Sequence, residues 1–325
     1  NENPLTGATD IVIYGMSDVH KDSRKKYGAT APMKSTPYMH SFGITNNYTI
    51  LPRMPVKFSL PLSKGKSMSE SFSDLPLPEP SEDNAFWLVP LDGGDVIKKF
   101  LPVDEKLYYT HTVNSFEVPE KSEVVIDLAT TAFNVFSADL STKDELNKSM
   151  RDACYKHDVP CINIVKRFHI PLGSGDIRIE VISDPTAKTD FTKMNYNYHG
   201  EKHCFYWGVE WFGDKKSKAY MSIVKYELCE GQDIVATKRS WHKDNWYPSE
   251  AIMINNPDPN AAEDDGVLTF IALEGASEQT YFITLNASTM EEISMAGPYA
   301  PVAFTTHAQW FQNMVPPRLS EAIVV

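Results

Sequence analysis

The chain has 325 residues, of which 42% are hydrophobic and 23% charged, ordinary values for a protein that buries an extensive core. Its formal net charge of −12 argues against nucleic acid or an anionic membrane surface as the main partner. No apolar run reaches the roughly 18 residues that a transmembrane helix needs. We therefore expect weak or no membrane association.

Seven segments predict short β-strands, because they alternate or are rich in β-branched and aromatic residues and are bounded by turn residues. In chain order they are 48–60, 84–92, 122–130, 175–183, 218–228, 266–275 and 279–287. Such regular spacing predicts an all-β sandwich, barrel or propeller. The absence of an exact repeat argues against a WD40-type propeller. No second domain is apparent, so residues 1–325 are predicted to form one domain.

Two segments depart from the strand pattern. Residues 62–86 are polar and rich in Ser and Pro, which predicts a long surface loop. Residues 141–157 (STKDELNKSMRDACYKH) have an N-cap candidate, an acidic first turn and neither Pro nor Gly, which predicts a helix.

The four cysteines, Cys154, Cys161, Cys204 and Cys229, lack the spacing of a zinc site. We expect free buried thiols, with a small loop closed between Cys154 and Cys161 as the alternative. Glycosylation sequons at Asn47, Asn147 and Asn286 would matter only if the protein were secreted.

Three histidines, His40, His111 and His307, each lie beside aromatic residues in strand-like surroundings. Neutral imidazole is a good ligand for Fe, Cu, Ni or Zn, so these histidines could form a metal centre on a closed β architecture. The alternative is a set of ordinary core histidines, because no two of them lie within one ligand motif.

The sequence segments around these histidines carry a more specific signal than the histidines alone. PYMHSFGITNNYTI (37–50) and THTVNSFE (110–117) resemble the second and third iron-ligand motifs of the carotenoid cleavage oxygenases. NWYPSEAIMINNPDPNAAEDDGVLTFIAL (245–273) is similar to a further hallmark of that family, and residues 281–311 resemble its closing segment. The similarity is strongest to the animal branch, which includes β-carotene oxygenase and the retinoid isomerase of the eye. The four matches occur in family order.

This resemblance implies a seven-bladed β-propeller with Fe(II) held on its axis by four histidines. His40, His111 and His307 match the second, third and fourth ligands. Glu250 matches a carboxylate that orients a ligand histidine through its other ring nitrogen. Asp190 stands where the family usually has Glu. Because its side chain is one methylene shorter, we expect its hydrogen bond to the ligand histidine to need a bridging water or to be absent.

The resemblance also implies a carotenoid or apocarotenoid as ligand, and an apolar tunnel that selects the double bond. Aromatic residues near the ligands in sequence are candidates to line it, although each one alone is more typical of propeller core. They are Phe42, Tyr109, Phe116, Phe304 and Trp310.

The chain departs from the family pattern at its beginning. NPLTGATDIVIYG (3–15) resembles a turn that follows the family's first histidine, which is therefore expected before Asn1. His20 is a substitute, but its hydrophilic surroundings indicate a solvated loop. The segment expected to dip into the membrane, near residues 62–74, is polar. Ala308 replaces the Gly that follows the fourth histidine.

Two functions remain open. The first is a non-haem Fe(II) dioxygenase that cleaves a polyene, with a missing N-terminal segment or another chain supplying the first ligand and completing the propeller. The second is a soluble carotenoid-binding pseudoenzyme that has lost oxygen chemistry. The missing first ligand, the shorter Asp190 side chain and the polar surface favour the pseudoenzyme. The retained histidine motifs and Glu250 favour the oxygenase, which we prefer by a narrow margin. By resemblance the protein is expected in the cytoplasm, with secretion as an open alternative.

Overall fold

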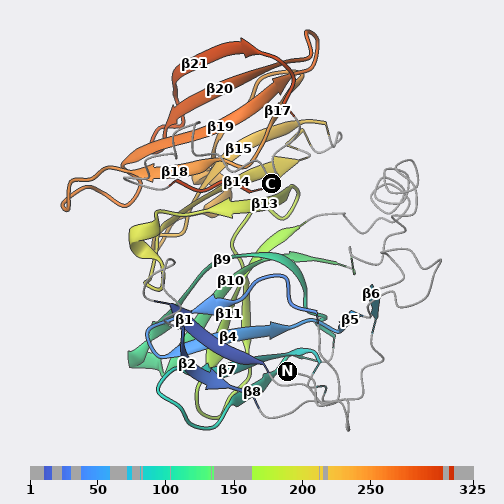
Figure 1. The fold of residues 1–325 in the computed structure, drawn as a ribbon, viewed down its shortest axis with the longest axis vertical. Helices are drawn as coiled ribbons and strands as arrows, with labels where there is room; N and C mark the ends of the chain where they lie inside the picture. The colour runs from blue at the N-terminus through green and yellow to red at the C-terminus, as the bar shows by residue number, and fades with distance from the viewer. Residues whose placement is uncertain are drawn as a thin grey trace.

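The computed structural model describes residues 11–16, 24–30, 38–58, 72–74, 81, 83–102, 104–132, 134, 163–211, 213–214, 219–302 and 307–310. These residues form antiparallel sheets, as the strand-rich sequence predicts (Figure 1). The helix expected over residues 141–157 and the possible Cys154–Cys161 pair lie outside the described residues, as do His20 and Phe304.

Three four-stranded sheets and one five-stranded sheet follow one another along the chain. The first contains β3 (Gly43–Ile44), β4 (Tyr48–Arg53), β7 (Ala85–Pro90) and β8 (Ile97–Phe100). The second contains β9 (Tyr108–Val118), β10 (Glu123–Thr131), β11 (Ile164–Pro171) and β12 (Arg178–Val181). The third contains β13 (Lys188–Lys193), β14 (Phe205–Trp211), β15 (Met221–Glu227) and β16 (Arg239–Trp241).

The fourth sheet contains β17 (Trp246–Pro248), β18 (Ile252–Asn255), β19 (Gly266–Glu274), β20 (Gln279–Asn286) and β21 (Glu292–Tyr299). The strands of the four-stranded sheets lie in sequence order, whereas β17 and β18 of the five-stranded sheet both pair with β19. Two hairpins accompany these sheets, β1 (Val12–Met16) with β2 (Arg24–Ala29) and β5 (Val56–Phe58) with β6 (Phe72–Asp74). The helical segments within the described residues are the single turns η2 (Pro119–Lys121), η4 (Tyr196–Tyr198) and α2 (Ile234–Thr237). None of these helices could cross a membrane.

Two boundaries differ from those expected. The run 48–60 is divided into β4 and β5 at Met54–Pro55. The predicted loop 62–86 contains β6, which pairs with β5, and its last residues begin β7.

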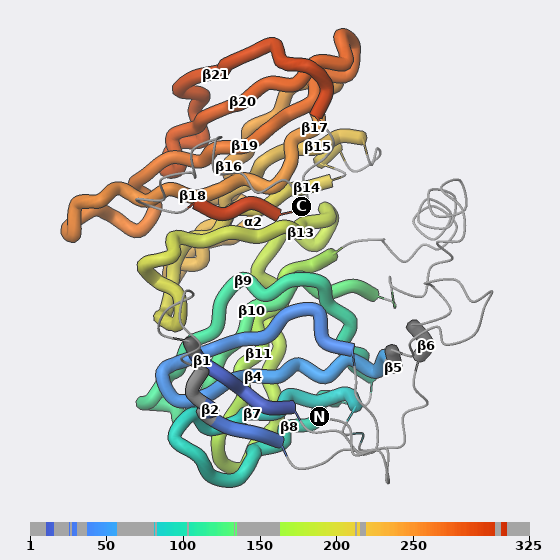
Figure 2. The backbone as a smooth tube through the Cα atoms, viewed as in Figure 1, coloured from blue at the N-terminus to red at the C-terminus, as the bar shows by residue number. Residues whose placement is uncertain are grey.

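Apolar side chains fill the space between successive sheets, so the sheets stack face to face. Ile50 and Phe86 pack with Leu128 and Phe168 between the β3–β8 and β9–β12 sheets. Two further clusters fill the next two interfaces, with Val165 and Tyr206 in one, and Trp207 and Phe270 in the other. Figure 2 shows the resulting order, from the blue N-terminal sheets to the orange and red C-terminal one. This serial stacking brings the first strands together, with β9 against both β3 and β13.

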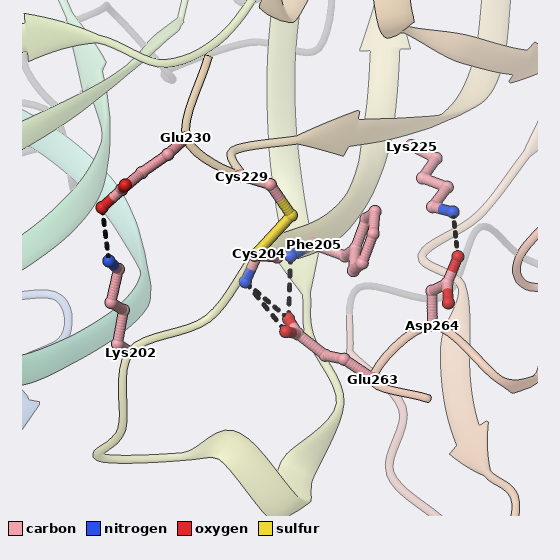
Figure 3. Close-up of a disulfide and its surroundings, with 8 residues drawn as sticks. All are labelled: Lys202, Cys204, Phe205, Lys225, Cys229, Glu230, Glu263 and Asp264. Carbon is pink, nitrogen blue, oxygen red and sulfur yellow. Dashed lines mark hydrogen bonds and ion pairs between the residues drawn. A yellow bond between two sulfur atoms is a disulfide. The ribbon is translucent and has the colours of Figure 1, made fainter. Parts of the chain in front are cut away.

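The expectation of free thiols is wrong for Cys204 and Cys229, which form a disulfide (Figure 3). The two residues stand 25 apart in sequence, but the β14–β15 ladder pairs Phe205 with Glu227 and so places them side by side. Disulfides are more typical of oxidising compartments than of the cytoplasm. The cytoplasmic location implied by resemblance therefore stays a prediction.

The acidic residues of the segment EDDG (263–266), which lies within the hallmark 245–273, join the third and fourth sheets. The Glu263 carboxylate accepts hydrogen bonds from the backbone N–H groups of Cys204 and Phe205, at 2.8–2.9 Å (Figure 3). The neighbouring Asp264 accepts a 2.5 Å bond from the Lys225 ammonium. These contacts connect the loop before β19 to β14 and β15, so this hallmark motif holds two sheets in register.

We expect Glu263→Gln to lower the free energy of unfolding by about 2 kcal/mol, because hydrogen bonds to a charged acceptor contribute about 1.5–3 kcal/mol. The measurement is urea denaturation followed by tryptophan fluorescence. Glu230→Gln is the matched control, since the Glu230 side chain is 91% exposed and its ion pair with Lys202 contributes little. Equal midpoints for the two variants would contradict this role of Glu263.

Candidate metal centre

The histidine-rich site forms where the first strands of the sheets meet. His40 lies three residues before β3, His111 lies in β9, and Asp190 lies in β13. Glu250 follows β17 by two residues. Because each is at or beside the first strand of a different sheet, the stacking of the sheets brings together residues that are far apart in sequence.

Irregular pairing gives His111 and Asp190 their positions. The β9–β10 register shifts twice near His111, so that β9 carries extra residues there. The β13–β14 register shifts directly after Asp190, where Phe191 has a φ of 50°. Bulges bend a strand and redirect its side chains, and they are common beside functional sites. Left-handed backbone is costly for a bulky residue, which indicates that the surroundings hold Phe191 in place.

Asp190 orients His111 directly. Its Oδ1 lies 2.7 Å from His111 Nδ1, and its Oδ2 accepts bonds from Thr110 Oγ1 at 2.8 Å and Asn163 Nδ2 at 2.6 Å. The expectation that the shorter side chain would need a water or fail is therefore wrong. The β13 register shift lies directly beside Asp190.

Glu250 has the same relation to His307. Its Oε2 lies 3.1 Å from His307 Nδ1 and also accepts the backbone N–H of Ala308 at 3.0 Å. Its Oε1 pairs with the Lys193 ammonium at 2.8 Å. The Glu250 side chain is only 2% exposed, so the cation and the amide compensate for the burial of its charge.

These contacts leave two imidazole nitrogens facing each other. A carboxylate can only accept, so His111 and His307 each donate from Nδ1. The two Nε2 atoms are 3.2 Å apart. Two imidazole nitrogens this close share either a proton or a metal ion. Ligands at a right angle around an ion with metal–nitrogen bonds of about 2.1 Å are about 3 Å apart, which this spacing matches.

His40 is the third member of the cluster. Its ring centroid is 5.2 Å from that of His111, and its Nδ1 lies 2.7 Å from the Tyr38 hydroxyl. Burial, followed by the proximity of His111, lowers the His40 pKa, which favours the neutral imidazole that a metal requires. In the part of the chain described, no group of three or more His, Cys, Asp or Glu side chains lies close enough together to bind one metal ion. The Nε2 atoms of His111 and His307 are close enough, and the His40 ring is next to His111.

Sequence reasoning missed Tyr38, Phe191 and Lys193. The Phe191 ring lies against His111 and His307, with centroids 5.2 and 5.9 Å away. Phe191 and Lys193 lie one and three residues after Asp190, and Tyr38 lies two residues before His40. In sequence none of the three can be distinguished from an ordinary strand residue.

The proposed tunnel residues lie in different surroundings. Tyr109 is fully buried, and its hydroxyl donates to the carbonyl oxygens of Ser41 and Pro52. Phe116 is buried with its edge toward His203. Phe42 and Trp310 are 56% and 53% exposed.

The family is shown by comparison with known proteins. The family model described as RPE65, retinal pigment epithelial membrane protein, matches residues 4–312. Among curated relatives, carotenoid cleavage dioxygenase 8 of Arabidopsis thaliana is 26% identical, over 84% of this chain and 46% of its own. The human mitochondrial carotenoid-cleaving dioxygenase is 24% identical, over 80% of this chain and 48% of its own. The chain belongs to the carotenoid oxygenase family.

Solved structures show the same fold at low identity. The crystal structure of an ACO/RPE65 chimera aligns with a TM-score of 0.72 at 18% identity, covering 94% of this chain and 59% of its own. The lignostilbene dioxygenase of Pseudomonas brassicacearum aligns with a TM-score of 0.69 at 18% identity, covering 94% and 61%. The chain spans about half the length of the curated relatives it matches.

We expect Asp190→Asn to destabilise the protein, by about 2 kcal/mol at neutral pH, since the new amide group opposes the donors that the carboxylate now accepts. Burial alone would raise the Asp190 pKa, but the hydrogen bond from His111 and the other donors lower it overall. A lowered carboxyl pKa stabilises the folded state above about pH 4, and this contribution is lost as pH falls. The stability difference should therefore narrow on acidification.

Denaturation midpoints measured from pH 3 to pH 7 test this expectation. Asp95→Asn is the control, because Asp95 is exposed. A difference between wild type and Asp190→Asn that stays constant over this range would contradict the assignment.

Proposed function

We propose that the protein acts on a carotenoid or apocarotenoid and uses non-haem iron to cleave a polyene double bond oxidatively. The observation that carries this proposal is the pair of Nε2 atoms, 3.2 Å apart, each on a ring whose Nδ1 is bonded to a buried carboxylate. Support also comes from relatives named as carotenoid-cleaving dioxygenases.

His40, His111 and His307 would hold the ion. When bound, Fe(II) supplies the redox chemistry by which O2 reacts with a double bond. Asp190 and Glu250 hold the Nδ1 protons, which keeps Nε2 available and makes the imidazoles more basic. For His40 to do the same, its Nδ1–H must donate to the Tyr38 oxygen. Burial raises the pKa of Tyr38, so this phenol stays neutral at physiological pH and can accept.

Two carboxylates and two ammonium groups surround the cluster. Lys193 pairs with Glu250, and Lys188 helps to lower the Asp190 pKa. Phe191 covers one side of the histidine pair and limits the approach of water there.

We further propose that the chain forms the major part of a single seven-bladed propeller domain. The rest of a longer protein, or another chain, would supply the remaining blades and a fourth histidine. The support is an open face on the last sheet, where apolar side chains of β20 and β21 remain exposed. They include Phe282 at 44%, Ile293 at 58% and Met295 at 45%. In the tunnel we place Phe42, Tyr109, Phe116, Phe304 and Trp310.

We expect the purified protein, reconstituted anaerobically with Fe(II), to bind iron and to convert an all-trans apocarotenal to shorter aldehydes. His111→Ala should abolish both, and Glu250→Gln should weaken iron binding about 10- to 100-fold. Iron is measured by inductively coupled plasma mass spectrometry and products by chromatography. The control is His199→Ala, since His199 stacks on Tyr196 in an outer loop.

A visible absorption spectrum of the same sample separates the two functions. Protein without iron that holds a stoichiometric polyene would overturn the oxygenase and leave the carotenoid-binding pseudoenzyme.

A further inference from the structure

Lys193 places an ammonium group beside the candidate metal centre. It is the last residue of β13, three residues after Asp190. Its Nζ lies 2.8 Å from Glu250 Oε1, so it reaches from the third sheet to the segment between β17 and β18 in the fourth. The pair therefore joins two sheets at the point where the histidines converge.

One strand supports both carboxylates of the site. Asp190 belongs to β13, and it bonds His111 of the second sheet at 2.7 Å. Lys193 lies on the same strand and bonds Glu250 of the fourth sheet. The register shift of β13 falls between Asp190 and Lys193. The positions of the two carboxylates are thus linked through one short piece of backbone.

Glu250 is the anchor for the chain at residues 307–310. A single oxygen, Oε2, lies 3.1 Å from His307 Nδ1 and accepts the Ala308 N–H at 3.0 Å. The His307 side chain is half exposed, so packing alone constrains it weakly. The direction of the ring therefore depends on the direction of the Glu250 carboxylate.

A carboxylate that is held at only one oxygen can still turn. Asp190 is held at both, because its Oδ2 accepts bonds from neutral donors, Thr110 Oγ1 and Asn163 Nδ2. Glu250 has one more rotatable bond than Asp190, and the contact to its Oε1 is the ammonium of Lys193. The Glu250 side chain is almost fully buried, where an ion pair is stronger than at the surface. Lys193 thus does for Glu250 what the two neutral donors do for Asp190.

We propose that Lys193 is a positioning residue of the metal centre, which fixes Glu250 and, through that carboxylate, the ring of His307. This inference rests on the proposed iron site, and it adds a residue that acts on a ligand only through another side chain. Charge-assisted hydrogen bonds are about twice as strong as neutral ones, which suits a contact that holds a flexible side chain. Without this bond the Glu250 carboxylate could turn, and the His307 ring would turn with it.

The alternative is an ion pair that only holds two sheets together. Lys225 provides a matched comparison, because it also extends from the third sheet to a carboxylate of the loop before β19, Asp264, at 2.5 Å. Its side chain is 6% exposed, against 26% for Lys193. Loss of either ammonium should lower stability, but only the loss at Lys193 should affect the histidines.

The test compares anaerobic Fe(II) binding by the protein and its variants, measured by competition with a chromogenic chelator. Lys193→Met should weaken binding about 10-fold, the lower end of the range for residues that support metal ligands. Lys193→Arg should restore most of the affinity, since a guanidinium also pairs with a carboxylate. Lys225→Met should lower the urea midpoint and leave the affinity unchanged. Wild-type affinity in Lys193→Met, or equal weakening in Lys193→Met and Lys225→Met, would overturn the proposal.

A second measurement needs no metal. In nuclear magnetic resonance spectra of the metal-free protein with isotope-labelled histidine, the Nδ1–H of His307 should give a hydrogen-bonded signal, which His307→Ala identifies. This signal should broaden or disappear in Lys193→Met and remain in Lys225→Met. An unchanged signal in Lys193→Met would overturn the proposal even if the wild type binds no iron. A wild type that binds no iron but loses the signal in Lys193→Met would overturn the iron chemistry alone.

Discussion

The hydrogen bond between Asp190 and His111 is the contact on which the site depends. It fixes the proton on Nδ1, turns Nε2 toward His307, and gives a buried carboxylate a partner for its charge. Without it, the ring could rotate or change tautomer, and the facing pair of nitrogens would be lost. The Thr110 and Asn163 donors hold the other oxygen of Asp190, so the carboxylate itself cannot rotate freely. Glu250 repeats this arrangement on a different sheet.

The stacking of the sheets is what makes such a contact available. The first strands of successive sheets lie beside one another, with β9 against both β3 and β13, and the apolar clusters between the sheets hold them at a fixed spacing. Gly43 shows how close that approach is, since a Cβ there would lie 2.8 Å from the Ser115 hydroxyl and 2.9 Å from Ile126. Any larger residue would push β3, and with it His40, away from β9. The Glu263 and Asp264 contacts serve the same purpose between the last two sheets.

Alternation of buried and exposed residues follows from the pleat of a sheet, and all seven segments predicted on that basis contain strands. The prediction did not include β9, β11, β13, β14 or β21. The run 122–130 became β10, and 279–287 became β20 with one residue fewer. The sequence also identified the family, because the motifs around His40, His111 and Glu250 are long and occur in order. The convergence of His111, Asp190 and His307 was an implication of that resemblance, since no local pattern relates residues 196 positions apart.

What the sequence could not predict arises from tertiary geometry. Asp190 lies directly beside a register shift in β13, and the Cys204–Cys229 pairing depends on the β14–β15 register. Composition and periodicity determine which faces are buried, but they do not determine where a strand shifts by one residue.

The most direct test of the central claim is a crystal structure of the iron-loaded protein with anomalous data collected at the iron edge. The account predicts a peak about 2 Å from Nε2 of both His111 and His307, with their Nδ1 atoms still bonded to Asp190 and Glu250. Iron bound elsewhere, or a His111–His307 pair with no peak between them at full iron occupancy, would contradict it.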